Sequence, residues 1–273
     1  MVRITIIQLR VADRSKEENL AMVLRLLDEA PASDLLLLPE LWPSGFFSFD
    51  WYREESEEID GPLVSALRQK VAEIATYTMI GSFVERSGNE YYNTALMLDP
   101  QGEVIARYRK VHLFGFQSRE RSLLTPGEGP VVFDLPWGRA GITTCYDLRF
   151  PELYRLMVDD GASIFLIPSA WPMARLAAWR LFNQARAHEN LAYLISCNCA
   201  GESRGTAFAG HSMIVDPLGK IIAETEEQGC YLTAEIDPQL AITVRRGFTA
   251  LDDRVYRVID RRLPLHRNSL DHS

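Results

Sequence analysis

The chain has little cysteine, no long apolar run and no excess of positive charge. Four cysteines among 273 residues, with no C-x-x-C pair, do not make a disulfide framework, so we expect a reducing compartment. The longest apolar stretch, 162–170, is far shorter than the roughly twenty residues that a membrane-spanning helix needs. Asp and Glu outnumber Lys and Arg by 37 to 29, and the net charge of −8 argues against nucleic acid or an anionic membrane as the main partner.

The first residues lack the pattern of a secretory signal. Residues 1–9 alternate like a β-strand, and a charged segment, 13–18, follows where a signal peptide has small residues. We therefore expect a cytoplasmic protein. Its length suits one large α/β domain or two small ones, and 47% apolar with 24% charged residues is typical of a globular chain.

Strand and helix patterns alternate twice along the chain. In the first half, strands are expected at 2–9, 35–38 and 78–84, with helices at 16–29 and 62–77. In the second half, strands are expected at 140–144, 162–167 and 191–197, with helices at 151–159 and 176–190. Each half then continues into a hairpin whose turn has the pattern D-P-x-G, at 99–102 and 216–219.

This repetition predicts an α/β protein with an internal pseudo-duplication, in which two layers of sheet pack between helices. The alternative is that D-P-x-G is simply a good turn that recurs by chance. We expect one domain over 1–247. The remaining residues, 248–273, form a polar tail of mixed charge, which is either disordered or held against something, with a partner subunit as a candidate.

Three reactive side chains follow predicted strands, at the sheet end where open α/β proteins present functional groups. Glu40 follows an apolar run, Lys110 follows a hairpin strand, and Cys145 lies between a strand and a helix. A cysteine at such a turn lies near backbone N–H groups, which lower a thiol pKa and can bind an oxyanion. Each residue alone also has an ordinary explanation: a buried thiol, a loop carboxylate or a solvated lysine.

Together with their neighbours, these residues resemble the motifs of the nitrilase, or carbon–nitrogen hydrolase, superfamily. The matching segments, in the family's order, are LLPE at 37–40, YRKVHLF at 108–114, GITTCYDLRFPE at 141–152, PSA at 168–170, RAHEN at 186–190 and the second D-P-x-G hairpin. The resemblance covers about residues 2–247. It implies a four-layer α-β-β-α sandwich that pairs into an eight-layer stack, so we expect a homodimer or a higher homo-oligomer.

The resemblance also implies roles for individual residues. Cys145 corresponds to the nucleophile, Glu40 to the general base and Lys110 to the cation that stabilises the tetrahedral intermediate. Glu120 corresponds to a second glutamate often found in the family, because it stands six residues before a Pro-Gly pair. The ordinary explanation of Glu120 is an exposed charged loop.

This set of groups is what amide hydrolysis requires. A thiol attacks the carbonyl carbon, and a nearby carboxylate of raised pKa takes the thiol proton and passes it to the departing ammonia. Lys110 and the backbone N–H of Tyr146 would stabilise the oxyanion. Glu40 would then activate water to release the acid from the thioester. The reaction needs no metal and no other cofactor.

Two other constellations are possible. His112, two residues from Lys110, could pair with Cys145 as in papain-like proteases, although a structural imidazole is the simpler interpretation. A zinc site could use His and Cys residues of the second half, but their spacing matches no common site, and we expect packing roles instead. The residues in question are His188, Cys197, Cys199 and His211.

Several residues near the strand ends are candidates for the substrate pocket. They are Trp42, Phe46, Tyr146, Ser169, Ala170 and Trp171. Asp147, Arg149 and Glu152 surround the nucleophile, and we expect them to form a buried ion-pair network, with recognition of a substrate carboxylate by Arg149 as the alternative. Arg175 and Arg204 are further candidates for binding such a carboxylate.

The sequence therefore predicts an amidase that releases ammonia from small amides through a cysteine thioester. The CYDLRFPE segment most resembles the ω-amidase branch, which acts on monoamides of small dicarboxylates such as 2-oxoglutaramate. A nitrilase and an N-carbamoyl amino acid hydrolase are the enzymatic alternatives, because all three chemistries need the same residues. A non-catalytic scaffold of the same fold is the alternative of another class.

Overall fold

The computed structural model describes residues 1–258, and most of the strands belong to two six-stranded sheets. The first sheet has the order β15-β1-β3-β4-β5-β6. Its strands are β1 (Val2–Gln8), β3 (Leu35–Leu37), β4 (Tyr77–Ser87), β5 (Glu90–Leu98), β6 (Val104–Arg109) and β15 (Cys230–Ile236). The second sheet has the order β14-β13-β10-β9-β8-β7. Its strands are β7 (Val131–Leu135), β8 (Gly138–Ile142), β9 (Ile164–Ser169), β10 (Tyr193–Asn198), β13 (Met213–Val215) and β14 (Ile221–Glu224).

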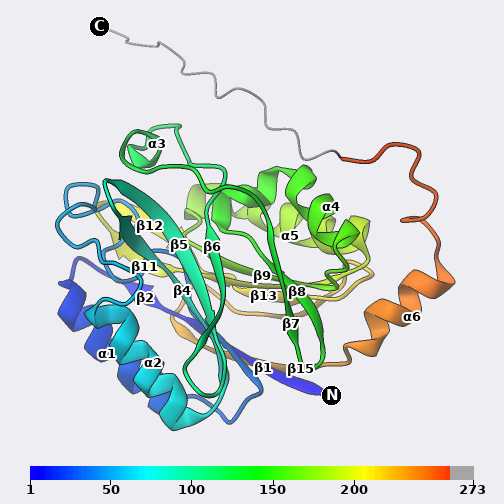
Figure 1. The fold of residues 1–273 in the computed structure, drawn as a ribbon, viewed down its shortest axis with the longest axis horizontal. Helices are drawn as coiled ribbons and strands as arrows, with labels where there is room; N and C mark the ends of the chain where they lie inside the picture. Colours follow the sequence, from blue (N-terminus) through cyan, green and yellow to red (C-terminus); the bar gives the residue numbers. More distant parts are fainter. Residues whose placement is uncertain (259–273) are drawn as a thin grey trace, which may run out of the picture.

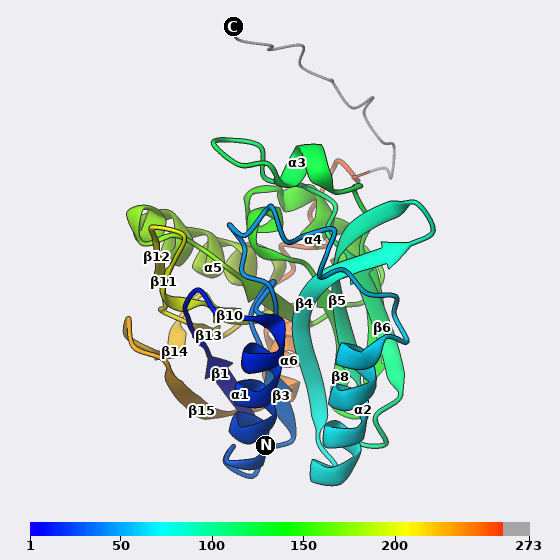
Figure 2. The same ribbon diagram turned by 90° about the vertical axis from the view of Figure 1, so that its left-hand side faces the viewer.

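The two sheets pack face to face between two pairs of helices (Figures 1 and 2). Helices α1 (Lys16–Asp28) and α2 (Pro62–Ile74) cover the outer face of the first sheet. Helices α4 (Pro151–Asp159) and α5 (Leu176–Asn190) cover the outer face of the second. This confirms the expected four-layer α-β-β-α sandwich.

The two sheets have the same plan, which confirms the internal pseudo-duplication. Each has three parallel strands joined through two helices, β1-β3-β4 in one sheet and β8-β9-β10 in the other. On one side lies an antiparallel hairpin, β5–β6 or β13–β14, and each hairpin turns through a D-P-x-G segment. On the other side lies one antiparallel strand, β15 or β7.

The apolar runs of the central strands divide their side chains between two cores. In β3, Leu35 and Leu37 face the second sheet, whereas Leu36 packs against α1 and α2. In β9, Ile164 lies between the sheets and Phe165 packs under the helices. Strands buried on both faces need apolar residues at every position, because successive side chains point to opposite faces.

Helix boundaries follow local signals where these exist. At the start of α1, Glu18 N–H donates to Ser15 Oγ (3.2 Å) and Ser15 N–H donates to Glu18 Oε2 (2.9 Å), which confirms the capping box. Helix α2 ends at Ile74, earlier than predicted, because Ala75 adopts a left-handed conformation with φ of 51°. The chain then enters β4, which is longer than expected.

Several elements were not predicted. They are a three-stranded sheet of β2 (Arg10–Val11), β11 (Ala200–Ser203) and β12 (Thr206–Ala209), the strands β7 and β15, and the helices α3 (Glu120–Leu123) and α6 (Gln239–Gly247). The Arg245 side chain of α6 donates to the backbone carbonyls of Ala162, Asn190 and Leu191, so α6 is held at the end of the second sheet.

The division between a domain at 1–247 and a tail at 248–273 stays a prediction. Within the described part of the tail, Arg254 forms an ion pair with Asp159 of α4. Residues 259–273 lie outside the described residues. Among the described residues, no helix combines the length and the apolar character needed to cross a membrane.

Candidate active site

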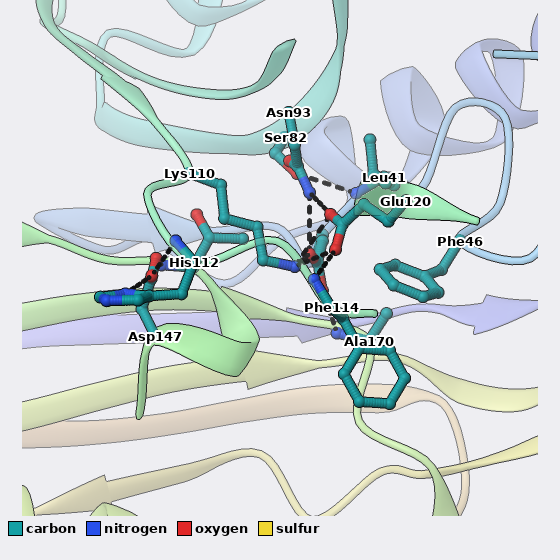
Figure 3. A network of polar contacts seen from close by, with 12 residues as sticks. Leu41, Phe46, Ser82, Asn93, Lys110, His112, Phe114, Glu120, Asp147 and Ala170 are labelled. Carbon is teal, nitrogen blue, oxygen red and sulfur yellow. Dashed lines mark hydrogen bonds and ion pairs between the residues drawn. The ribbon is translucent and has the colours of Figure 1, made fainter. Parts of the chain in front are cut away.

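The three residues that follow predicted strands converge at one end of the sandwich. Lys110 Nζ lies 2.8 Å from Glu40 Oε1 and 2.9 and 3.0 Å from the two carboxylate oxygens of Glu120 (Figure 3). The side chains of Glu40, Lys110 and Glu120 are completely buried, and Cys145 beside them is 7% exposed. Glu120 is therefore part of this cluster and not of an exposed loop.

Neutral donors complete the hydrogen bonding of the two carboxylates. Asn93 Nδ2 donates to Glu40 Oε1 (2.8 Å) and to Glu120 Oε1 (3.0 Å), so one amide group bridges both (Figure 3). The backbone N–H of Ala170 donates to Glu40 Oε2 (2.9 Å), and that of Phe114 donates to Glu120 Oε2 (2.7 Å). Sequence reasoning missed Asn93. The available signal was an asparagine, a residue type that strands disfavour, inside the segment expected to form a hairpin strand.

Strained backbone places two of these side chains. Cys145 and Leu41, the residue after Glu40, have positive φ angles of 49° and 43°. Such conformations are unfavourable for residues other than glycine and occur often at functional sites. The loop before Glu40 also passes very close to Gly81 of β4, where an added Cβ would lie 2.0 Å from the Pro39 carbonyl oxygen. Only glycine allows this approach.

The turn after Cys145 is fixed by Asp147. Its buried carboxylate accepts hydrogen bonds from the Tyr108 hydroxyl (2.7 Å) and from the backbone N–H groups of Thr144 and His112 (both 2.9 Å). It therefore ties the segment that carries Lys110 to the turn that carries Cys145. The predicted ion-pair network with Arg149 and Glu152 does not form among the described residues, because Asp147 is already satisfied by these donors.

Burial and neighbouring charges set the protonation states. Burial alone would lower the pKa of Lys110, but the carboxylates of Glu120 and Glu40 more than offset it and raise that pKa above its usual value. Burial raises the pKa of Glu120, an effect that Lys110 opposes and Glu40 reinforces. Burial also raises the pKa of the Cys145 thiol, and the Glu40 charge adds to this increase while Lys110 opposes it. At neutral pH the site thus holds a fixed cation and a protonated thiol that needs a base.

A pocket with about 340 Å³ of empty space, its open mouth included, reaches Cys145. The pocket is small and suits a small molecule. Six of the predicted substrate-binding candidates line it: Phe46, Tyr146, Arg149, Ala170, Trp171 and Arg175. Phe47, Phe114 and Pro172, together with Cys145, complete the lining.

Two predicted pocket residues lie elsewhere. Trp42 packs in the core between the first sheet and its helices, and its indole N–H donates to the Ile80 carbonyl (2.8 Å). Ser169 is buried at the end of β9, where its carbonyl accepts from the backbone N–H of Cys199 (3.0 Å). Neither lines the pocket.

The alternative constellations find no support in the geometry. The Nδ1 atom of His112 lies 2.8 Å from Asp147 Oδ1, and its ring stacks on Phe150 with centroids 3.7 Å apart, which suits a structural imidazole. The four candidate zinc residues make separate contacts: Cys197 with the Ile7 carbonyl, Cys199 with the Glu40 carbonyl, His188 with the Leu218 carbonyl and His211 with Glu224.

The duplicated sandwich, with glutamate, lysine and cysteine gathered at its strand ends, has the α/β fold of the nitrilase superfamily. The family model for carbon–nitrogen hydrolases matches residues 3–246, and the chain therefore belongs to the carbon–nitrogen hydrolase family.

Named relatives agree with this assignment. The chain is 33% identical over 246 residues to a 2-oxoglutaramate amidase of Paenarthrobacter nicotinovorans, an alignment that covers 87% of this chain and 84% of that protein. A solved CN-hydrolase superfamily protein of Xanthomonas campestris, with an arsenic adduct in its active site, superposes with a TM-score of 0.88 at 30% identity and covers 94% of this chain and 98% of that one. An amidase of Nesterenkonia sp. AN1, solved as a Glu-to-Gln mutant with acrylamide added to its active-site cysteine, gives a TM-score of 0.79 at 27% identity, covering 90% and 98%.

Proposed function

We propose that the protein is an amidase that converts small amides to a carboxylate and ammonia through a thioester on Cys145. The observation that carries the proposal is the buried cluster beside this thiol, in which one lysine holds two glutamates. Burying three ionisable groups is unfavourable unless they are paired, so such a cluster next to a nucleophile favours a chemical role over a structural one.

In the first half of the proposed reaction, Glu40 accepts the Sγ proton of Cys145 as the sulfur attacks the amide carbon. The C–N bond then breaks, Glu40 passes the proton to the leaving nitrogen, and ammonia departs. Carboxylates positioned for such transfers typically accelerate reactions by about 10²–10⁴-fold.

The oxyanion of the tetrahedral intermediate needs preorganised donors. An ammonium has three N–H groups, and Lys110 faces three carboxylate oxygens, one of Glu40 and two of Glu120. In the proposed reaction one N–H serves both oxygens of Glu120, and another turns to the oxyanion. The backbone N–H of Tyr146, which makes no hydrogen bond with any described residue, is a second candidate donor. Loss of one such donor typically lowers the rate by about 10²–10³-fold.

In the second half, Glu40 takes a proton from water as the water oxygen attacks the thioester carbon. The C–S bond breaks, the acid leaves, and the proton returns to Cys145. Glu120 is proposed as a positioning residue, because it binds Lys110 through both oxygens and fixes the backbone of Phe114 at the pocket.

We propose a monoamide of a small dicarboxylate as the substrate class. The support is the similarity to relatives named 2-oxoglutaramate amidase, including one of Bacillus subtilis that is 35% identical over 226 residues. The small pocket agrees with a substrate of this size.

The direct test is to follow ammonia release from succinamate, propionamide, a short aliphatic nitrile and N-carbamoyl-β-alanine. We expect the highest kcat/KM with succinamate, no turnover by the Cys145→Ala variant at unchanged thermal stability, and no loss of activity in EDTA. Preferential turnover of the nitrile or the carbamoyl compound would transfer the assignment to those chemistries. A protein that folds and releases ammonia from none of the four would favour the scaffold.

We also propose that the protein is a homo-oligomer. Large apolar side chains are exposed at Leu181 of α5 and, beyond α6, at Phe248, Val255 and Tyr256. A second subunit would cover such groups. Light scattering on the full chain and on a chain that ends at residue 247 tests both the assembly and the contribution of the tail. The cytoplasmic location expected from the sequence stays a prediction.

A further inference from the structure

Two arginines line the pocket that contains Cys145, and neither has an acidic partner. Arg149 and Arg175 form no ion pair, and their side chains no hydrogen bond, with any residue in the part of the chain that the structure describes. No acidic residue lines the pocket. The nearby Glu40 and Glu120 are already bound to Lys110. In a chain with a net charge of −8, two unpaired cations at one small pocket mark a place for an anion.

Aromatic rings hold both guanidinium groups. The Arg149 guanidinium carbon lies 5.0 Å from the ring centre of Phe182 and 5.2 Å from that of Trp171. The corresponding carbon of Arg175 lies 5.0 Å from the ring centre of Phe114 and 5.5 Å from that of Phe116. Such contacts partly stabilise the charge without using the N–H donors, which stay available for a carboxylate.

The backbone at Arg175 is also fixed. Its carbonyl accepts the indole N–H of Trp171 (2.9 Å), and its own N–H donates to the Pro172 carbonyl (3.0 Å). Arg175 therefore begins α5 from a defined position at the pocket and does not extend from a free loop.

Arg204, the third arginine considered from the sequence, differs from these two. Its guanidinium carbon lies 4.4 Å from the ring centre of Trp51, its backbone N–H donates to Asp13, and it does not line the pocket. It provides a matched control, because it is also an arginine that stacks on an aromatic ring.

We propose that Arg175 and Arg149 together bind the free carboxylate of the substrate and so determine its class. This inference rests on the proposed amidase function. The amide group would lie at Cys145 while the carboxylate at the other end of the molecule accepts N–H donors from the two guanidinium groups. The site would then select amides that carry an ionised acid over their esters and over neutral amides of equal length.

The test compares kcat/KM for three amides: succinamate, its methyl ester and butyramide. The wild-type protein should prefer succinamate strongly. Arg175→Gln and Arg149→Gln should each lower kcat/KM for succinamate by about 10–100-fold, mainly through KM, because hydrogen bonds to a charged group are lost. The loss with butyramide should be much smaller, and Arg204→Gln should leave the ratio of the two substrates unchanged.

A binding measurement gives a readout that does not depend on turnover. Succinate titrated into the Cys145→Ala protein should bind. Its affinity should be lower by about 10-fold or more in the Cys145→Ala/Arg175→Gln double variant, and the affinity should also fall as the salt concentration rises. If Arg149→Gln fails to fold, Arg149→Lys takes its place, because lysine keeps the positive charge near the Cys145 turn. Arg149→Lys should still weaken binding, because lysine lacks the forked donor geometry of the guanidinium.

The outcomes separate the two levels of the proposal. Equal turnover of succinamate and butyramide by the wild type would overturn the carboxylate subsite and leave the amidase intact. A preference for succinamate that survives both arginine variants would place the subsite elsewhere. Failure to hydrolyse any amide would instead contradict the proposed function itself.

Discussion

Glu40 Oε1 accepts a hydrogen bond of 2.8 Å from Lys110 Nζ, with both side chains fully buried. The two residues follow different strands of the first sheet, β3 and β6, so the pair exists only once the sheet has formed. Lys110 carries a positive charge at every physiological pH, because the surrounding carboxylates raise its pKa. It therefore places a fixed positive charge against the carboxylate of the proposed base.

Glu40→Gln should separate thiol reactivity from turnover. The glutamine cannot shuttle a proton, so amide hydrolysis should fall by about 10²–10⁴-fold. The Glu40 charge raises the pKa of the Cys145 thiol, second to burial, whereas Lys110 lowers it. Removal of that negative charge should therefore increase the thiolate fraction, and acrylamide should still alkylate Cys145, as measured by mass spectrometry. A variant that hydrolyses amides within a few-fold of the wild type would assign the base to another residue.

Lys110→Met should destabilise the protein in a pH-dependent way. Two buried carboxylates would remain without their cation, which costs about 3–5 kcal/mol of the free energy of unfolding. Burial already raises the pKa of Glu120, and loss of Lys110 removes the charge that lowers it. The folded state would then bind a proton more tightly than the unfolded state, so stability should fall as the pH rises above the ordinary carboxyl pKa of 4.5.

Urea unfolding of Lys110→Met at pH 5 and pH 8 measures this effect, with the larger loss relative to wild type expected at pH 8. Lys70→Met is the control, because Lys70 pairs with Asp28 and Glu73 at the surface and its removal should change stability little at either pH. Equal losses at the two pH values would show that the carboxylates do not remain charged and buried in the variant.

The sequence predicted the parts of the fold that have a strong local pattern. The central strands are continuous apolar runs, and α4 begins at a proline, so α4 was predicted with the correct bounds. The bounds of α5 were also predicted correctly, although it has no capping side chain. The edge strand β15 was not predicted, because its pairing with β1 joins the two ends of the sandwich domain and has no local signal.

The site was partly predictable for the same reason. Glu40, Lys110 and Cys145 follow strands, and strand ends at one edge of a sheet meet in space. Trp42 was misplaced because Leu41 adopts a left-handed conformation, after which the chain turns the indole into the core and away from the pocket. The bridging contact of Asn93 depends on two carboxylates from distant segments, which no spacing in the sequence indicates.

Asp147→Asn should weaken the connection between the Lys110 segment and the Cys145 turn. The carboxylate accepts hydrogen bonds from Tyr108, Thr144 and His112, and an amide would face at least one of these donors with its own NH₂ group. We expect a loss of about 2–4 kcal/mol in stability. We also expect a fall in kcat with little change in KM, because the lysine and the thiol would no longer be aligned. The exposed Asp134→Asn serves as the control, and equal behaviour of the two variants would contradict a role for the buried carboxylate.

Asn93→Leu should move the pH dependence of the reaction. The side-chain amide donates to both Glu40 and Glu120, and its hydrogen bond lowers the pKa of Glu120 against the dominant effect of burial. A leucine of similar size offers no donor, so the charged form of Glu120 loses stabilisation and the pKa of Glu120 rises. The acidic limb of the kcat/KM profile should therefore shift to higher pH, and kcat at its optimum should fall. Asn93→Gln, which retains an amide donor, should recover part of the shift. A profile that keeps its acidic limb in Asn93→Leu while kcat falls would mean that Asn93 only supports the packing of β5 and does not tune Glu120.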